Sequence, residues 1–281
     1  MKKGLRSSIV LALILMLALF SLGGCGNSDV AGENNNENEV AEQTSDAYDQ
    51  IVERGYIIMG LDDTFAPMGF RDEKNEIVGF DVDLAKEVFA RLDLEVKFQP
   101  IDWTMKETEL NSGNIDLIWN GYTITEERKQ KVSFTKPYLK NRQIVITMAD
   151  SDINTKADLA GKIVAIQNQS SAIDAVNTEP ELVASFKGGE PVLFDTNNEC
   201  FMDLEAGRSD AVVADEVLAR YYIKLRGPEN YKVLDEDFGE EDYGIGVRKT
   251  DVKLLEAVNN TLDEMREDGK YQEIYEKWFA E

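Results

Sequence analysis

The sequence predicts an α/β protein built from two similar units, on two observations. Short apolar strands alternate with amphipathic helices along most of the chain, which is typical of sheets covered by helices. In addition, "LNSGNIDLIWNG" (110–121) and "LEAGRSDAVVAD" (204–215) share a helix-ending glycine, an aspartate three residues later and an apolar strand with a polar end. Gly113 and Gly207, like Asp116 and Asp210, lie 94 residues apart. Generic helix-to-strand chemistry also explains this match, without a common origin.

The expected elements follow one another in order. "YIIMGL" (56–61) is a short buried strand, "GFDVDLAKEVFARLDL" is a helix with apolar residues at helical spacing, and "EVKFQPI" is a strand. Next come helix "KETELNSG", strand "DLIWNG", helix "ERKQKV", strand "RQIVITM", helix "KADLAG" and strand "KIVAIQ". Helices near 198–206 and 216–225 then flank the strand "DAVVAD", and a last helix has Leu255, Val258, Leu262 and Met265 on one face. Such alternation predicts parallel sheets covered by helices.

The first 24 residues have the pattern of a bacterial secretory signal. A positive start (Lys2, Lys3 and Arg6) precedes the 12-residue apolar run "IVLALILMLALF", and "SLGGC" follows at once. This is the small-residue end of a lipoprotein cleavage site, so Cys25 is the expected lipidated residue, carrying palmitate among its acyl chains. A membrane-spanning anchor is the alternative, but the run is shorter than the roughly 20 residues that a span needs.

Residues 25–46 are rich in Asn and Glu and contain no aromatic residue, which predicts a flexible tether. Without Lys2, Lys3 and Arg6, 27 basic residues face 54 acidic ones, a net charge of −27. Nucleic acid is therefore excluded as a partner, because phosphate binding needs a basic face. An anionic membrane surface would also repel the protein, which makes the lipid on Cys25 more necessary.

The cysteine and histidine content excludes several kinds of chemistry. With Cys25 lipidated, Cys200 has no partner, so we expect no disulfide and a buried thiol at this apolar position. The chain has no histidine. Nucleophile systems based on Ser-His or Cys-His and histidine metal sites are thereby excluded. We expect no metal and no cofactor.

Polar residues gather where the strand "DLIWNG" ends. Asn120, Gly121 and Thr123 lie at its carboxyl end, Thr125 is a good N-cap, and Arg128 falls at about the third helical position. A cation there opposes the helix dipole, which suggests another role for it. Helix amides, a threonine hydroxyl and a guanidinium together make a carboxylate site. The alternative is an arginine in a surface ion pair.

The second unit offers complementary groups. Its strand "KIVAIQ" ends at Gln167, and Ser170 and Ser171 open the next helix with further donors for an anion. Asp215 ends the strand "DAVVAD" and suits an ammonium group, with an N-cap as the alternative role. Arg128 for a carboxylate and Asp215 for an ammonium would together define an α-amino acid.

The sequence resembles the bacterial extracellular solute-binding proteins of family 3, the polar amino-acid-binding proteins of ABC importers. The resemblance rests on "DDTFAPMGF", "GFDVDLAKEV", "LNSGNIDLIWNGYTITEERKQKVSFTKPY", "AGRSDAVVADE" and the terminal "DGKYQEIYEKWF", in the family's order. It implies a two-lobed periplasmic-binding-protein-like fold, with two α/β lobes joined by two crossover segments. It also implies a lipid-anchored receptor outside the cytoplasm that delivers an amino acid to a membrane permease.

The resemblance also implies roles for single residues. Arg128 would hold the ligand carboxylate with Thr123 and the Ser170–Ser171 turn, Gly121 would contribute backbone, and Asp215 would take the ammonium. Phe65 and Trp103 would wall the ligand side chain, with lobe core as the alternative, and Asp62 would face its tip. Two departures leave the ligand open: Gln167 is a neutral amide where some relatives have a basic residue, and Ala214 adds no polar side chain.

We expect residues 47–140 and 240–281 to form the first lobe and 141–239 the second, with crossings near Lys140 and Glu241. The protein is expected to be a monomer that binds a polar, non-acidic amino acid: arginine or lysine, glutamine or cystine. Asn120 and Gln167 suit a neutral amide end, whereas Asp62 suits a cationic one. Two alternatives are a sensor lobe for a signalling partner and an enzyme, a dehydratase or lyase, on the same fold.

Overall fold

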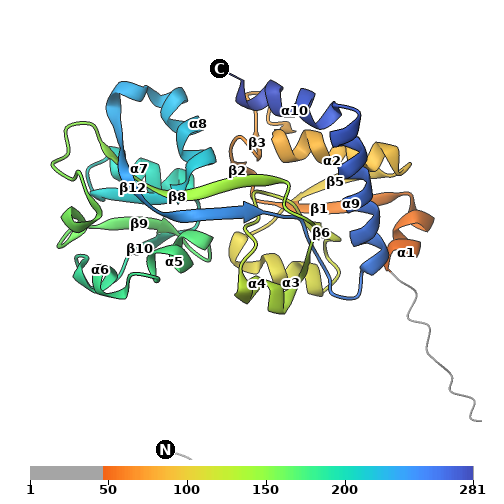
Figure 1. The fold of residues 1–281 in the computed structure, drawn as a ribbon, viewed down its shortest axis with the longest axis horizontal. Helices are drawn as coiled ribbons and strands as arrows, with labels where there is room; N and C mark the ends of the chain where they lie inside the picture. Colours follow the sequence, from red (N-terminus) through yellow and green to blue (C-terminus); the bar gives the residue numbers. More distant parts are fainter. Residues whose placement is uncertain (1–46, 281) are drawn as a thin grey trace, which may run out of the picture. The chain divides into compact units, whose positions relative to one another are not determined.

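The computed structural model describes residues 47–280, so the predictions for the signal, for Cys25 and for the tether lie outside the described residues. Those residues form two α/β lobes, each with a five-stranded sheet (Figure 1). The first sheet has the order β5-β1-β6-β13-β7. Its strands are β1 (Tyr56–Leu61), β5 (Glu95–Pro100), β6 (Leu117–Ile118), β7 (Ser133–Phe134) and β13 (Gly246–Val247). Its helices are α1 (Ala47–Arg54), α2 (Phe80–Arg91), α3 (Lys106–Asn111), α4 (Glu126–Lys131), α9 (Val252–Glu267) and α10 (Lys270–Phe279).

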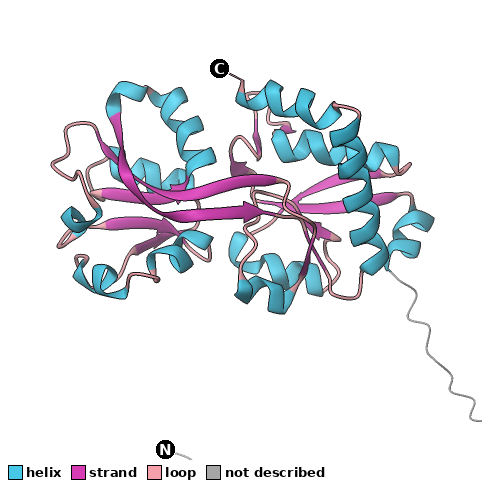
Figure 2. Ribbon diagram, in the orientation of Figure 1, coloured by secondary structure: helices cyan, strands magenta, loops and turns pink. Residues whose placement is uncertain are grey.

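The second sheet has the order β10-β9-β11-β8-β12, and helices lie on both faces of each sheet (Figure 2). Its strands are β8 (Leu139–Met148), β9 (Val164–Gln167), β10 (Val192–Phe194), β11 (Ala211–Asp215) and β12 (Tyr231–Tyr243). Its helices are α5 (Ser171–Val176), α6 (Pro180–Ser185), α7 (Asn197–Glu205) and α8 (Glu216–Arg226). A small sheet of β2 (Thr64–Phe65), β3 (Gly69–Arg71) and β4 (Ile77–Val78) and three 3-10 helices (Trp103–Met105, Lys156–Leu159 and Pro228–Asn230) complete the fold.

The expectation of parallel sheets was wrong in part, because both sheets are mixed. β1 pairs in parallel with β5 and β6, and β9 with β10 and β11. In contrast, β8 runs antiparallel to β11 and β12, and β13 runs antiparallel to β6 and β7. These strands enter their sheets from the segments that pass between the lobes, so no helical crossover sets their direction.

Two expected elements also differ in kind or extent. The segment "KADLAG" forms a 3-10 helix, in which Asp158 and Thr155 make a reciprocal capping box. The strand in "DLIWNG" is only two residues long, because the chain leaves the sheet after Ile118. The buried face of α9 is centred on Leu254, Val258, Leu262 and Met265, with Leu255 only partly buried.

Two long strands occupy the places where the crossings were expected. β8 and β12 pair with each other, with Leu139 opposite Tyr243, Lys140 opposite Asp242 and Asn141 opposite Glu241. They lie side by side in Figure 1. β12 continues to β13 in the first sheet, while the other end of β8 lies in the second. The exact lobe boundaries, with 47–140 and 240–281 in the first lobe and 141–239 in the second, remain a prediction.

The repeated sequence pattern is also a repeated structural unit. Gly113 and Gly207 both have a positive φ, 77° and 67°, as residues that end a helix in this way require. Asp116 Oδ2 accepts a hydrogen bond from the backbone N–H of Ile58 at 2.7 Å, and Asp210 Oδ2 accepts one from Ile163 at 2.7 Å. Each aspartate therefore ties the turn to the neighbouring strand of its own sheet.

Cys200 is a free thiol with no exposed surface, as predicted. It packs in the apolar core of the second lobe, and burial raises the pKa of its thiol well above the usual range. Within residues 47–280, no helix is both long enough and apolar enough to cross a bilayer.

Candidate functional site

The loop after β6 and the start of α4 place Arg128 at the boundary between the lobes. The Thr125 Oγ1 accepts a hydrogen bond from the Arg128 backbone N–H at 3.1 Å, which confirms the predicted N-cap. Arg128 is 5% exposed, and the Cζ of its guanidinium lies 4.7 Å from the ring centroid of Tyr122. Its Nη1 donates to the Thr123 carbonyl at 3.0 Å, and its Nη2 donates to the Gln169 carbonyl of the second lobe at 3.2 Å.

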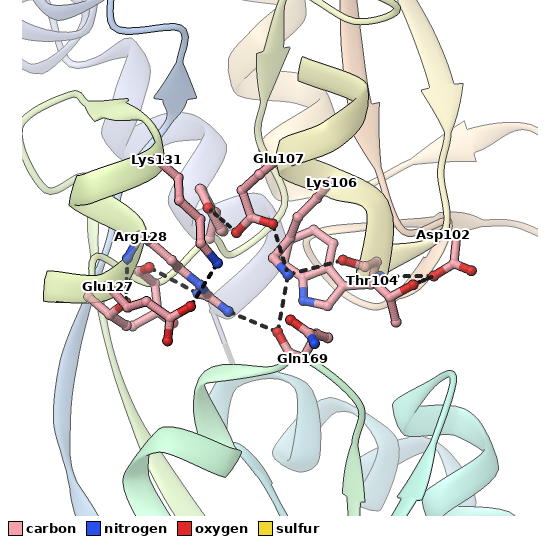
Figure 3. Close-up of polar contacts among 12 residues, drawn as sticks. Asp102, Thr104, Lys106, Glu107, Glu127, Arg128, Lys131 and Gln169 are labelled. Carbon is pink, nitrogen blue, oxygen red and sulfur yellow. Dashed lines mark hydrogen bonds and ion pairs between the residues drawn. The ribbon is translucent and has the colours of Figure 1, made fainter. Parts of the chain in front are cut away.

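A second buried cation lies beside Arg128. The Nζ of Lys106 donates to the Trp103 carbonyl at 3.0 Å and to the Gln169 carbonyl at 3.2 Å, so both cations converge on Gln169 (Figure 3). Burial, and then the charge of Arg128, lower the pKa of Lys106 to about 8. A cavity of about 190 Å³ adjoins these groups; it is lined by Lys106, Glu107, Glu127, Arg128, Lys131, Gln169, Ser170, Ile173 and Asp174. Both lobes therefore contribute to this charged cavity.

Hydroxyl groups of the two lobes meet next to Arg128. Thr123 Oγ1 and Ser171 Oγ lie 3.0 Å apart and are hydrogen-bonded. The neighbouring Ser170 is 7% exposed, and its Oγ is buried without a hydrogen-bond partner among the described residues. The three hydroxyls that the sequence assigned to the carboxylate end of a ligand thus lie together at the lobe boundary.

Asp215 lies at the end of β11, 4% exposed. Its Oδ1 accepts from Tyr243 OH at 2.6 Å, from Asn141 Nδ2 at 2.7 Å and from Gln143 Nε2 at 3.1 Å. Burial, and then the nearby Glu241 carboxylate, raise the pKa of Asp215 well above its usual value. The alternative role as a side-chain cap of α8 is not seen: Asp215 makes no cap bond, and Asn141 Oδ1 accepts from Val217 N–H instead.

Asp62 and Gln167 connect the lobes at the other end of the candidate site. Gln167 Nε2 donates to Asp62 Oδ2 at 3.0 Å, and Thr64 donates to Asp62 Oδ1 through both its backbone N–H and its hydroxyl. Asp62 is 6% exposed, and burial is the main cause of its raised pKa. Asn120 Oδ1 accepts from the Asp62 backbone N–H at 3.0 Å, and the buried Nδ2 of Asn120 has no hydrogen-bond partner among the described residues.

The two aromatic candidates differ in their surroundings. Phe65 lies against Gly121, since a Cβ on that glycine would come within 2.8 Å of the Phe65 ring. Gly121 has a φ of 55°, so both its conformation and this close approach require glycine. Trp103 packs edge-on against Tyr122, with 5.7 Å between ring centroids, in an apolar cluster of the first lobe. The surroundings of Trp103 therefore correspond to the core alternative at least as well as to a pocket wall.

The structure adds residues that the sequence did not single out: Asp81, Asn141, Gln143, Glu241 and Tyr243. Asn141 and Gln143 alternate with the charged Lys140 and Arg142 along β8, which places the two neutral amides on one face of the strand, and this period of two was the one local signal. Glu241 lies in the charged run "DEDFGEED", and such a run is typical of a solvent-exposed surface. Among residues 47–280, no group of three or more acidic or cysteine side chains could hold a metal ion.

Comparisons with known proteins give a family model that matches most of the chain and several related binding proteins. The model of the family described as bacterial extracellular solute-binding proteins, family 3, matches residues 57–281. The chain is 31% identical over 233 residues to the L-cystine-binding protein TcyJ of Escherichia coli (strain K12), covering 82% of this chain and 85% of that protein. It is 29% identical over 277 residues to the ABC transporter glutamine-binding protein GlnH of Bacillus subtilis (strain 168), covering 96% of each.

A solved structure is similar over nearly the same region. This is the crystal structure of an ABC uptake transporter substrate binding protein from Streptococcus pneumoniae with bound histidine, at 39% sequence identity. The TM-score is 0.82, and the match covers 84% of this chain and 97% of that one. The two-lobed α/β architecture is therefore shared with a protein that holds an amino acid.

Proposed function

Because this chain belongs to the bacterial extracellular solute-binding proteins of family 3, we propose that it captures a polar amino acid between its lobes and delivers it to an ABC-type permease. One observation carries this proposal: a buried cation, Arg128, and a buried acid, Asp215, lie at the same boundary between the lobes, together with hydroxyls from both. The named relatives bind amino acids and are not enzymes. The protein is accordingly a binding protein, and it acts outside the cytoplasm.

Arg128 binds the α-carboxylate of the amino acid. Its guanidinium offers a planar set of N–H donors, which matches the two oxygens of a carboxylate better than a point charge does. Thr123 and Ser171 place hydroxyl donors beside it, and Ser170 Oγ has no partner of its own among the described residues. Because the guanidinium is nearly buried, its bond to a carboxylate is little screened by salt.

Asp62 sets the preference for the ligand side chain. Among the described residues it contacts no lysine or arginine, although it is buried and its pKa is raised by burial. A donor or a cation on the ligand would compensate this acid, whereas a second carboxylate would repel it. The Nδ2 of Asn120 and the amide of Gln167 suit an amide or another polar end equally well. The candidates are therefore arginine or lysine, glutamine and cystine.

A thermal-shift screen of the protein over the twenty amino acids, ornithine and cystine tests the function. A ligand at 100 times its Kd raises the free energy of unfolding by about 2.7 kcal/mol, which gives a clear rise in Tm. At least one polar, non-acidic amino acid should produce such a rise. No shift with any of them would contradict amino-acid binding, and aspartate or glutamate as the tightest ligand would contradict the role given to Asp62.

The variant Asp62→Asn identifies the side-chain class. A cationic ligand should lose more than about tenfold in affinity, because one charge-assisted contact is lost, and a neutral ligand should change little. Isothermal titration of arginine, glutamine and cystine measures this. Asp63→Asn is the matched control, because Asp63 is next in the chain but pairs with Arg71 at the surface. If Asp62→Asn and Asp63→Asn bound a cationic ligand with equal affinity, Asp62 would not contact the ligand side chain.

The protein is anchored to the membrane through a lipid on Cys25 and works as a monomer, and the short apolar run before that cysteine is its signal. Changing Cys25 to Ser should therefore release the protein from the membrane fraction in a form that still binds its amino acid. Fractionation of cells followed by the thermal-shift screen measures both properties. A variant that stays in the membrane fraction would refute the lipid anchor.

A further inference from the structure

One oxygen of Glu241 accepts an unusual number of hydrogen bonds. Its Oε1 lies 2.6 Å from Asn141 Nδ2, 2.8 Å from Gln143 Nε2, 2.8 Å from Thr123 Oγ1 and 3.4 Å from Ser171 Oγ. These donors come from both lobes and from the crossover strand β8. Glu241 itself belongs to β12, the other long strand between the lobes. Its carboxylate is thus held at the lobe boundary, although its sequence context resembles solvated surface.

Glu241 and Asp215 share two of these donors. Asn141 Nδ2 and Gln143 Nε2 each donate to both carboxylates, so the two acids lie next to each other. Neutral amides supply hydrogen bonds but no positive charge. Gln143 is 1% exposed, and its Oε1 is buried without a hydrogen-bond partner among the described residues. The Oε1 of Gln143 is therefore a hydrogen-bond acceptor that remains available beside the two carboxyl groups.

No cation of the described chain compensates the pair. The groups hydrogen-bonded to it are Tyr243 of β12, Asn141 and Gln143 of β8, Ser171 of α5 and Thr123 of the loop after β6, and among these only the Tyr243 phenol is titratable. Glu241 also lines an open cavity with Asp174, Glu240, Asp242 and Lys129, and Lys129 pairs with Glu126 rather than with Glu241. The nearby Arg128 donates to backbone carbonyls instead. Asp215 is buried and Glu241 is half-buried beside it, and two like charges this close disfavour double ionisation, so Asp215 retains its proton unless a cation enters.

We propose that Glu241 and Asp215 act together as the site for the ligand's α-ammonium, and that binding of the amino acid expels the proton that Asp215 holds beside the Glu241 carboxylate. This inference rests on the proposed function and adds a specificity-determining residue to it. An ammonium brings one positive charge and three N–H donors. Asp215, Glu241 and the unpartnered Gln143 Oε1 are three acceptors that can receive them.

The proton balance is simple. Without the ammonium the pair carries one negative charge and one proton; with it, both carboxyls are ionised and the proton passes to solvent. Because binding releases a proton, the affinity for the amino acid should rise with pH. The logarithm of the association constant should increase by up to about one per pH unit. Burial first, and the Glu241 carboxylate second, raise the pKa of Asp215 well above its usual value, so Asp215 is the carboxyl that holds this proton.

Isothermal titration of L-arginine, L-glutamine and L-cystine into the protein at pH 7, in phosphate and in Tris, tests the proposal. The two buffers differ in their enthalpy of protonation, so the difference in observed heat counts the protons released. We expect release of up to about one proton per amino acid bound. The variant Glu241→Gln keeps an acceptor for the four donors but removes the charge, so affinity should fall more than tenfold and fewer protons should be released.

Glu240→Gln is the matched control, because Glu240 is exposed and adjacent on the same strand. Its affinity and proton count should equal those of the unmodified protein. Glu241→Gln with an equally normal affinity and proton count would overturn the proposal. A loss of affinity with an unchanged proton count would also overturn it, because Glu241 would then only support Thr123 and Ser171. Circular dichroism establishes that each variant is folded.

The failure of this inference can be told apart from the failure of the proposed function. If the unmodified protein bound none of the three amino acids, nor any other in the thermal-shift screen, the function itself would be wrong. If it bound one tightly without exchanging a proton, only the paired site would be wrong.

Discussion

Arg128→Ala should abolish binding of every amino-acid ligand while leaving the protein folded. The ligand carboxylate would then be buried at the lobe boundary without its cation, and removing one partner of a desolvated ion pair costs on the order of 2 to 5 kcal/mol. That is roughly 30-fold to several thousandfold in Kd. Isothermal titration with the amino acid found in the thermal-shift screen measures the loss.

Arg128 also has a structural contribution, which must be separated from binding. Its guanidinium donates to the carbonyls of Thr123 and Gln169, and Gln169 keeps a second donor in Lys106. The Thr123 carbonyl loses its side-chain donor, and a buried acceptor left unpaired costs about 1 to 3 kcal/mol if water does not replace the donor. The Tm of the variant without ligand should therefore fall, whereas the circular dichroism spectrum should not change. Arg128→Lys should bind poorly as well, since a point charge does not reproduce the planar set of donors.

Lys129→Ala is the control for Arg128, because Lys129 is exposed on the same helix and pairs with Glu126 at the surface. Such pairs contribute little to stability. This control should bind normally. An Arg128→Ala variant with the affinity of the control would show that the carboxylate is bound elsewhere.

The sequence predicted the fold class and the elements around Arg128 because those depend on local patterns. Thr125 is an N-cap and Arg128 the third residue of its helix, as the spacing of hydroxyl, acidic and basic residues indicated. The repeated glycine-to-aspartate pattern gave two equivalent turns, since a positive φ and a side-chain bond to the adjacent strand are needed in both. The N-cap and the positive-φ glycines depend on residues close together in the sequence, so the sequence pattern was enough to predict them.

Features that depend on distant segments could not be predicted in this way. Glu241 meets Thr123 across 118 residues and Asn141 across 100, so no sequence window contains both partners. The antiparallel strands in each sheet arise from the passage of the chain between lobes, which alternation of strand and helix does not encode. Trp103 illustrates the same limit: its aromatic type suits a pocket wall or a core, and its packing against Tyr122 is a tertiary contact that no sequence pattern encodes.

Asp81 is a buried acid that holds the backbone of Gly121, one of the candidate site residues, in place. It lies on α2 with no exposed surface, and its Oδ2 accepts from the Gly121 backbone N–H at 2.7 Å and from Tyr138 OH at 2.8 Å. Its Oδ1 is buried without a partner within the described part of the chain. Burial raises the pKa of Asp81 to about 7, against the lowering effect of these hydrogen bonds. The carboxyl therefore exchanges its proton near neutral pH while it holds the backbone of Gly121.

The stability of the protein should consequently fall as the pH rises from about 4 to about 8. The folded state holds the Asp81 proton more tightly than the unfolded chain, whose aspartates have a pKa of about 3.9. This contribution is fully present below the unfolded pKa and is lost as the pH passes the folded value of about 7. A shift of about three units corresponds to a contribution on the order of 4 kcal/mol to the free energy of unfolding. Asp62 and Asp215, whose pKa values burial also raises, act in the same direction.

Asp81→Asn should remove much of that pH dependence, because an amide keeps an oxygen acceptor for Gly121 and Tyr138 but cannot lose a proton in this range. Urea unfolding of both proteins at several values between about pH 4.5 and 8 measures it: the variant should gain stability relative to the unmodified protein as the pH rises. Asp83→Asn is the control, since Asp83 lies on the same helix but pairs with Lys277. Parallel curves for the unmodified protein and Asp81→Asn would mean that Asp81 keeps the same charge throughout. The loss of stability would then come from Asp62 and Asp215 at the lobe boundary, where an added amino acid would alter it.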